Sequence, residues 1–195
     1  MALTNVESNA ALVVIDLQKG IARISTVHPI EGIIARAAQL ARAFRERKLP
    51  VVLVNVAGRA PGRTDTATPK DSLPADSAEL VPELAQQPSD YLLTKQRLGA
   101  FIGTGLDRYL REHGVTQIFL AGVSTSVGVE STARSAYDHG YHVVLVIDAI
   151  TDRDAEAHLH AVEKIFPRIG ETTTTDAVLK MLSSASCGPS GIARQ

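Results

Sequence analysis

Short apolar runs alternate along the chain with longer segments of helical periodicity. The runs are almost continuously apolar, which is typical of parallel strands covered on both faces of a sheet. We expect strands at Ala11–Ile15, Val51–Val56, Tyr91–Thr94, Gln117–Gly122 and His142–Ile147, with a weaker sixth candidate at Glu171–Thr174.

Between these runs, apolar residues recur at the spacing of amphipathic helices. Helices are predicted at Ile30–Lys48, Gly105–His113, Ser126–His139, Asp152–Phe166 and Thr175–Leu182. Thr151 and Asp154 are candidates for a capping box before the fourth of these helices, and Pro167 follows its expected end. The alternation predicts an α/β fold with a parallel sheet and right-handed crossovers.

Two segments depart from this alternation. Ala57–Asp90 is rich in proline, and only Ser77–Gln86 within it has a helical pattern. An irregular stretch of this length is often a substrate loop, and a plain surface excursion is the alternative. Ser183–Gln195 is rich in Gly and Ser, which predicts a flexible tail after one domain at residues 1–182.

Composition narrows the class of protein. The 195 residues are 45% hydrophobic and 21% charged, with a net charge of −1, so no broad basic surface for nucleic acid is expected. No apolar run is long enough to span a membrane, and the first ten residues do not resemble a secretion signal. Cys187 is the single cysteine, so no intrachain disulfide forms, and a cytoplasmic location is expected.

Ligands of open parallel sheets bind beyond the carboxyl ends of the strands. The polar residues at those points are Asp16, Asn55, Lys95 and Asp148. Asp16 can act as a catalytic carboxylate and Lys95 as its electrostatic partner if their strands are neighbours. A local turn for Asp16 and a solvated loop for Lys95 are the alternatives. The ammonium would hold Asp16 ionised, whereas burial would oppose ionisation.

The segment Gly122–Ala133 is a third candidate, because a strand ends there and a helix begins. The first turn of a helix offers unpaired N–H groups that suit an oxyanion or a carboxylate. Ordinary capping by Ser124, Thr125 or Ser126 is the alternative. The glycine fingerprints of dinucleotide-binding and phosphate-binding loops are absent.

Three motifs in this order resemble the isochorismatase-like hydrolases. They are D-x-Q at Asp16–Gln18, K-x-R-x-x-A-F at Lys95–Phe101 and G-V-x-T-x-V-x-V-E-x-T-A-R at Gly122–Arg134. The resemblance covers about residues 10–182. It implies a three-layer α/β/α sandwich with a six-stranded parallel, Rossmann-like sheet, and a homo-oligomer, either a dimer or a tetramer.

Most members of this family resemble cysteine amidases with a catalytic Asp, Lys and Cys. Asp16 and Lys95 match the first two, but Gly128 occupies the position of the Cys. Glycine at this position is similar to the true isochorismatases, which cleave a vinyl ether without a covalent intermediate. The resemblance then implies that Asp16 is the general acid, that Lys95 orients it, and that Gly128 leaves room for the substrate.

The resemblance also implies which residues contact the substrate. These positions are Gln18, Arg97, Leu98, Val123, Ser124 and Val127. Leu98 and Ser124 stand where isochorismatases carry tyrosines, so the pocket chemistry is expected to differ. Arg59, Arg63, Lys70 and Arg97 are candidates for carboxylate contacts, and solvated surface charges are the alternative. The family pattern further implies a cis peptide at Val123–Ser124.

Neither a metal nor a cofactor is expected, and the partner is a small-molecule substrate rather than nucleic acid or a membrane. The spacing of the histidines does not form a metal site; His158 and His160, for example, point to different faces of a helix. Other readings stay open: an inactive family member that binds a ligand or partner, an amide hydrolase whose Cys is replaced at Gly128, and an unrelated flavin- or nucleotide-binding module.

Overall fold

The computed structural model describes residues 3–65 and 74–184. Its strands are β1 (Ala10–Ile15), β2 (Val51–Val56), β3 (Tyr91–Lys95), β4 (Gln117–Val123), β5 (His142–Thr151) and β6 (Glu171–Thr173). Its α-helices are α1 (Lys19–Ala22), α2 (Ile30–Glu46), α3 (Leu106–Glu112), α4 (Glu130–Asp138), α5 (Ala155–His160), α6 (Phe166–Ile169) and α7 (Thr175–Ser184). A 3₁₀ turn, η1 (Pro82–Leu84), and two π-helical turns, η2 (Thr125–Val129) and η3 (Ala161–Ile165), complete the elements.

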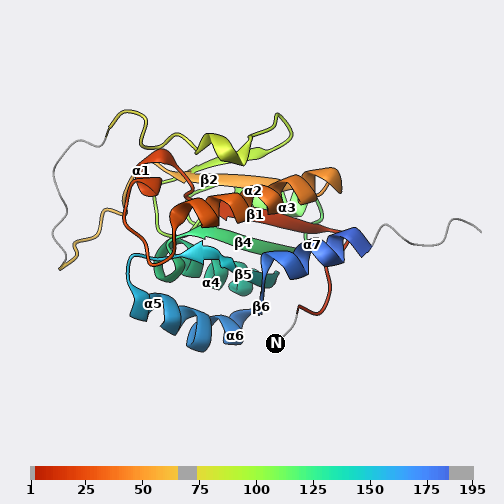
Figure 1. The fold of residues 1–195 in the computed structure, drawn as a ribbon. Helices are drawn as coiled ribbons and strands as arrows, with labels where there is room; N and C mark the ends of the chain where they lie inside the picture. Colours follow the sequence, from red (N-terminus) through yellow and green to blue (C-terminus); the bar gives the residue numbers. More distant parts are fainter. Residues whose placement is uncertain (1–2, 66–73, 185–195) are drawn as a thin grey trace, which may run out of the picture.

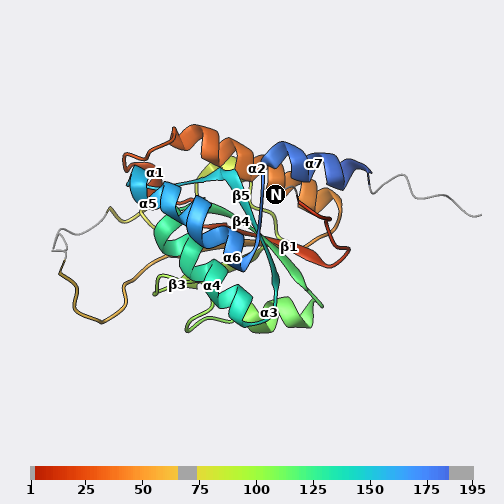
Figure 2. The same cartoon turned by 90° about the horizontal axis from the view of Figure 1, so that it is seen from below.

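The six strands form one parallel sheet in the order β3-β2-β1-β4-β5-β6. Helices α2 and α7 cover one face, and α3, α4, α5 and α6 cover the other, so the molecule has three layers (Figures 1 and 2). This confirms the predicted α/β sandwich. The central pair β1 and β4 carries residues buried on both faces, as their unbroken apolar runs predict.

Each face of the sheet has its own hydrophobic core. On the α2 side, Leu12 and Val14 of β1 pack with Phe44 of α2 and Phe119 of β4, and the two aromatic rings meet edge to face at 5.3 Å. On the opposite side, Val13 and Ile15 pack among the α3, α4 and α6 side chains. The alternation of β1 side chains between two cores fixes its register against both neighbours.

The helix predicted at Asp152–Phe166 differs from the observed segment. It begins at Ala155, passes through the π turn η3 and continues as α6 beyond Pro167. Pro167 is the second residue of α6, which follows directly on the π turn η3. The capping-box prediction was also wrong: Thr151 ends β5, and the Asp154 side chain alone caps the helix by accepting from Ala157 N–H.

Two further predictions on helices need correction. Residues 77–86 form turns and the short η1 element rather than a helix, because this segment pairs with the chain after β1. The helix predicted at Ser126–His139 starts as the π turn η2 and becomes α-helical only at Glu130. The expected tail was placed at Ser183–Gln195, but its first two residues belong to α7. Cys187 in the rest of that tail lies outside the described residues, and so does Lys70.

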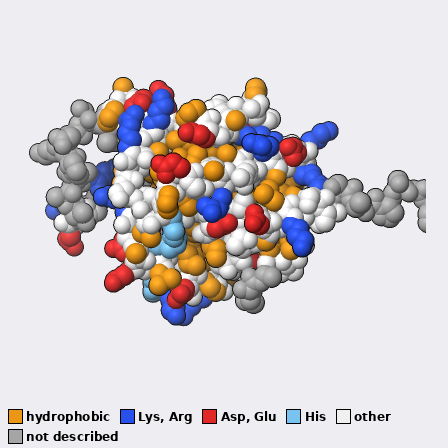
Figure 3. Space-filling model, in the orientation of Figure 1, with side chains coloured by type: hydrophobic (Ala, Val, Ile, Leu, Met, Phe, Trp, Pro, Cys, Tyr) orange, Lys and Arg blue, Asp and Glu red, His pale blue; other side chains and the backbone are white. Residues whose placement is uncertain are grey.

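Acidic and basic side chains are interspersed on the face in Figure 3, with apolar side chains between them. This mixture agrees with the small net charge of the whole chain. Within residues 3–65 and 74–184, no helix has the length and apolar character needed to cross a membrane.

Candidate active site

A pocket of about 440 Å³ opens at the carboxyl ends of the strands. Its walls contain residues at or after the ends of β1, β2, β3, β4 and β5, which is where ligands of parallel sheets bind. The structure brings nearly all of the predicted site residues together here: Asp16, Lys95, Arg97, Leu98, Val123, Ser124, Val127 and Gly128. Gln18 does not line the pocket.

Asp16 follows β1 directly and adopts a left-handed backbone conformation, with φ of 53°. Its N–H donates to Val54 O of β2, and its carbonyl accepts from Gln18 N–H, so a tight turn replaces the strand at this point. Asp tolerates this conformation better than a β-branched residue does. The turn directs the carboxylate into the pocket, where the residue is only 6% exposed.

Lys95 holds one oxygen of this carboxylate. Its Nζ lies 2.8 Å from Asp16 Oδ2 and also donates to the carbonyls of Arg97 and Leu98. The sequence argument required β1 and β3 to be neighbours, yet β2 lies between them. The long lysine side chain crosses the end of β2 instead. Among the described residues, Asp16 Oδ1 is buried and has no hydrogen-bond partner.

Burial and the ion pair have opposite effects on Asp16, and burial is the larger. Desolvation raises the pKa of Asp16 from 3.8 to about 6, although the Lys95 charge and hydrogen bond act to lower it. A pKa close to neutrality suits a group that must donate a proton and recover it in each turnover. The same carboxyl is therefore available in its acid form under mild conditions.

Gly128 lies opposite the Asp16 carboxylate. It belongs to η2, which follows the cis peptide Val123–Ser124 at the end of β4. A Cβ atom on Gly128 would lie 3.3 Å from Asp16 Oδ2 and 3.1 Å from Ile15 Cγ2. Any side chain at this position would crowd Asp16 and Ile15, and glycine avoids that contact.

The hydroxyls predicted as helix caps have other partners. Ser126 donates both its N–H and its Oγ–H to Asp152 Oδ2, and Thr125 Oγ1 lies 2.8 Å from His158 Nδ1. The Ser126 N–H is therefore occupied by a carboxylate of the protein itself. Burial lowers the pKa of His158, and the nearby His28 acts in the same direction. These hydrogen bonds connect η2 to Asp152 and His158, which follow β5 in the chain.

The Gln18 side chain holds the turn that carries Asp16 in place through hydrogen bonds to the backbone. Its Oε1 accepts from Val56 N–H, and its Nε2 donates to the carbonyls of Val56 and Ser77. The amide is thereby used in full, and the side chain is 4% exposed. Sequence reasoning placed Gln18 among the substrate contacts, whereas its position makes it a support for Asp16.

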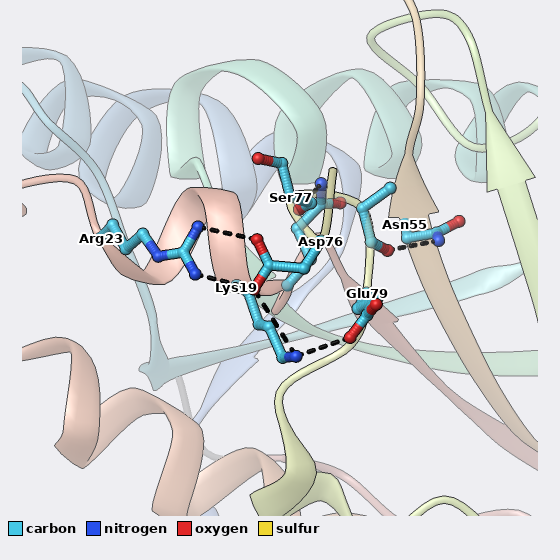
Figure 4. Close-up of polar contacts among 8 residues, drawn as sticks. Lys19, Arg23, Asn55, Asp76, Ser77 and Glu79 are labelled. Carbon is cyan, nitrogen blue, oxygen red and sulfur yellow. Dashed lines mark hydrogen bonds and ion pairs between the residues drawn. The ribbon is translucent and has the colours of Figure 1, made fainter. Parts of the chain in front are cut away.

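The segment after Pro74 completes this support. Its backbone pairs with the chain after β1 through Val81 N–H to Leu17 O, Lys19 N–H to Glu79 O and Gly20 N–H to Ser77 O. Figure 4 shows the outer side of this pairing, where Lys19 lies between Asp76 and Glu79 and Arg23 faces Asp76. Asn55 donates to Ala78 O in the same cluster rather than entering the pocket.

Several pocket residues were not predicted from the sequence, among them Ile21, Ile24, Thr26 and the charged Arg153. The predicted strand ended at Ile147, so Asp148 was examined as the residue beyond it. Asp148 lies elsewhere: it accepts from Thr175 N–H and Oγ–H and pairs with Arg36. Strand β5 continues to Thr151, with a register shift against β4, and Arg153 is the residue that reaches the pocket.

The described residues contain no cluster of three or more His, Cys, Asp or Glu side chains suited to hold a metal ion. The pocket offers instead one carboxyl group, one buried ammonium group and several arginines around an open centre. Such a set can bind an anionic molecule and exchange a proton with it.

Comparison with known proteins places the chain in a family. The isochorismatase domain matches residues 10–177. An uncharacterized isochorismatase family protein of Bacillus subtilis, YwoC, is 40% identical over 88% of this chain and 93% of its own length. The structure of an isochorismatase family protein from Burkholderia thailandensis superposes with a TM-score of 0.87 at 39% identity, covering 92% of this chain and 98% of that one.

Two further relatives are named, one for a biosynthetic pathway and one for an activity. The phenazine biosynthesis protein PhzD1 of Pseudomonas aeruginosa is 34% identical over 88% of this chain and 85% of its own length. The ureidoacrylate amidohydrolase RutB of Stutzerimonas stutzeri is 34% identical, over only 54% of this chain and 43% of its own length. The family match over residues 10–177 and the 40% identity to YwoC lead to one conclusion: the chain belongs to the isochorismatase family of hydrolases.

Proposed function

We propose that this hydrolase cleaves the vinyl ether of a small carboxylated metabolite of the isochorismate type, with Asp16 as general acid and no covalent enzyme intermediate. One observation carries the proposal: a buried carboxyl group with a raised pKa borders the pocket, and the position beside it, Gly128, has no side chain that could act as a nucleophile. General acid catalysis needs that combination, whereas covalent catalysis would need a nucleophile in the same place.

Protonated Asp16 donates its proton to the methylene carbon of the enolpyruvyl group. The carbon of the C–O bond becomes an oxocarbenium centre, and water adds to it while giving one proton back to Asp16. Collapse of the resulting hemiketal releases pyruvate and the ring alcohol, so one water is consumed for each C–O bond broken. Lys95 is bonded to Oδ2 and thereby leaves Oδ1 as the oxygen that carries the transferable proton.

Pyruvate release from isochorismate tests this proposal. Wild-type protein is expected to release pyruvate, and Asp16→Asn to lose at least about 100-fold in kcat, the usual scale for removal of a general acid. Asp176→Asn on α7 is the matched control, with activity unchanged. Full activity of Asp16→Asn would refute the role of Asp16, and a folded wild-type protein without turnover would refute the substrate.

Amide hydrolysis is the second candidate, favoured by the local similarity to an amidohydrolase. The family resemblance places a cysteine at Gly128, and a Cβ there lies beside Asp16. Gly128→Cys is then expected to gain turnover on a panel of small amides that the wild type does not hydrolyse. No gain would count against this candidate. Tight binding of isochorismate without turnover would instead support the inactive ligand-binding member.

A further inference from the structure

The pocket concentrates positive charge in a chain that is nearly neutral overall. Lys95, Arg59, Arg63, Arg97 and Arg153 all line it, against the single carboxylate of Asp16 among the described lining residues. In the described part of the chain, Arg59, Arg63 and Arg153 have no ion-pair partner. Guanidinium groups gathered without counter-charges around a pocket indicate an anionic ligand.

These cations lie on two sides of the reacting centre. Arg59 and Arg97 follow β2 and β3, whereas Arg153 follows β5. Asp16 and Gly128, after β1 and β4, lie between the two sides. Since neighbouring strands are about 4.8 Å apart, the ends of β2 and β5 are separated by roughly 14 Å. The charge is therefore divided across the centre of the pocket rather than gathered at one edge.

The backbone of Arg153 is braced by a buried carboxylate. Asp152 is 4% exposed, and its Oδ1 accepts from the N–H groups of Arg153 and Asp154. Its Oδ2 accepts the N–H and Oγ–H of Ser126 in the turn that carries Gly128. Asp152 thus joins the two turns and is fully occupied by these four donors. Arg153 starts from a fixed backbone position, which favours a defined contact with a ligand.

We propose that Arg153 is a specificity-determining residue that binds an anionic group of the substrate on the β5 side of Asp16. The arginines after β2 and β3 bind a second anionic group, so the preferred substrate carries carboxylates on both sides of the bond that is cleaved. This inference rests on the proposed function for its site. The planar guanidinium suits a carboxylate because it can donate two parallel hydrogen bonds.

Binding of unreactive acids tests the inference without turnover. Benzoate is compared with benzene-1,3-dicarboxylate and benzene-1,4-dicarboxylate by calorimetric titration of wild type, Arg153→Gln and Arg153→Lys. The wild type is expected to bind at least one dicarboxylate about 10-fold more tightly than benzoate, the scale of a charged hydrogen bond. Arg153→Gln should reduce this ratio towards 1, and Arg153→Lys should give an intermediate ratio.

Arg108→Gln is the matched control, because Arg108 is an exposed helix residue outside the pocket. It should keep the wild-type ratio, and the melting temperatures of all variants should agree. A wild type that does not distinguish the acids, or an unchanged ratio in Arg153→Gln, would overturn the inference. The two proposals can fail separately, since a wild type that shows the Arg153-dependent ratio but releases no pyruvate from isochorismate refutes the reaction and not the role of Arg153.

Discussion

Gly128 and Asp16 meet across the pocket so closely that a Cβ on the glycine would lie 3.3 Å from the carboxylate oxygen Oδ2. The acid belongs to the turn after β1 and the glycine to the turn after β4, the two central strands of the sheet. Any side chain at position 128 therefore changes both the space and the solvation of the acid.

Gly128→Ala is expected to lower kcat for pyruvate release by about 10-fold or more, because the methyl group occupies the space beside the acid and displaces the substrate by a fraction of an ångström. The methyl also removes water from Asp16, so the pKa of the carboxyl rises further. Steady-state kinetics as a function of pH measures both effects. Wild-type kcat and KM in Gly128→Ala would show that catalysis does not depend on the absence of a side chain at position 128.

The proposed role of Asp16 as general acid predicts how activity depends on pH. With a pKa of about 6 in the free enzyme, kcat/KM should be constant at lower pH and fall tenfold per pH unit well above 6. Lys95 lowers this pKa, so Lys95→Met should move the decline to higher pH as well as reduce kcat. Profiles of pyruvate release between pH 4.5 and 8.5 measure this, and a rate that rises through pH 6 would contradict it.

The same group links stability to pH. Folded Asp16 binds its proton more tightly than the unfolded chain does, so its contribution to the free energy of unfolding decreases as pH rises from about 4 to 6. A pKa raised from 3.8 to about 6 corresponds to about 3 kcal/mol. Urea unfolding of wild type and Asp16→Asn at pH 4 and pH 7 should show the wild type losing about this amount relative to the variant. An equal difference at both pH values would refute the shift.

Gly122 permits the close approach of β4 to β1. Its φ is 117°, and a Cβ would lie 2.0 Å from Ile15 O. Gly122→Ala should therefore lower the free energy of unfolding by more than about 3 kcal/mol, through strain and displacement of the strand before Asp16. Gly140→Ala, at φ of 85° with open space, is the control and should cost only about 1–2 kcal/mol. Similar losses in both variants would contradict the close contact.

Arg45 and Asp90 form a largely buried bidentate ion pair between α2 and the turn before β3. The Nε–Oδ1 and Nη2–Oδ2 distances are 3.0 and 2.8 Å, and the Asp90 side chain is 1% exposed. Asp90→Ala should cost about 3–5 kcal/mol, because it leaves Arg45 without its counter-charge. Glu112→Ala breaks the exposed pair with Arg108 and should cost less than about 1 kcal/mol. Thermal unfolding of the two variants compares them directly.

Sequence patterns located the strands well, because the apolar runs of β1, β2 and β4 are continuous and the turn residues after them are polar. The exception is β5. Asp148 interrupts its apolar run where the register against β4 shifts, so the strand looked complete four residues before its true end. Arg153 was overlooked for that reason.

The role of Gln18 depends on a contact that local patterns do not encode. Its partners Val56 and Ser77 lie 38 and 59 residues further along the chain. A motif can mark the glutamine as important, but only the folded chain shows whether its amide reaches the pocket or the backbone. The helical pattern at 77–86 was outweighed in the same way by pairing with the chain after Asp16.

Gln18 bonds to Val56 and to Ser77 at once, and so it ties the end of β2 to a later point within the long excursion between β2 and β3. Insertions and deletions between two such fixed points cost little free energy of folding, since each doubling of the loop length adds only about 0.6 kcal/mol to the cost of closing the loop. The wall of the pocket on this side can therefore diverge between relatives while Asp16 stays in place. Relatives can thereby evolve pockets for substrates of different size without moving the turn that carries Asp16.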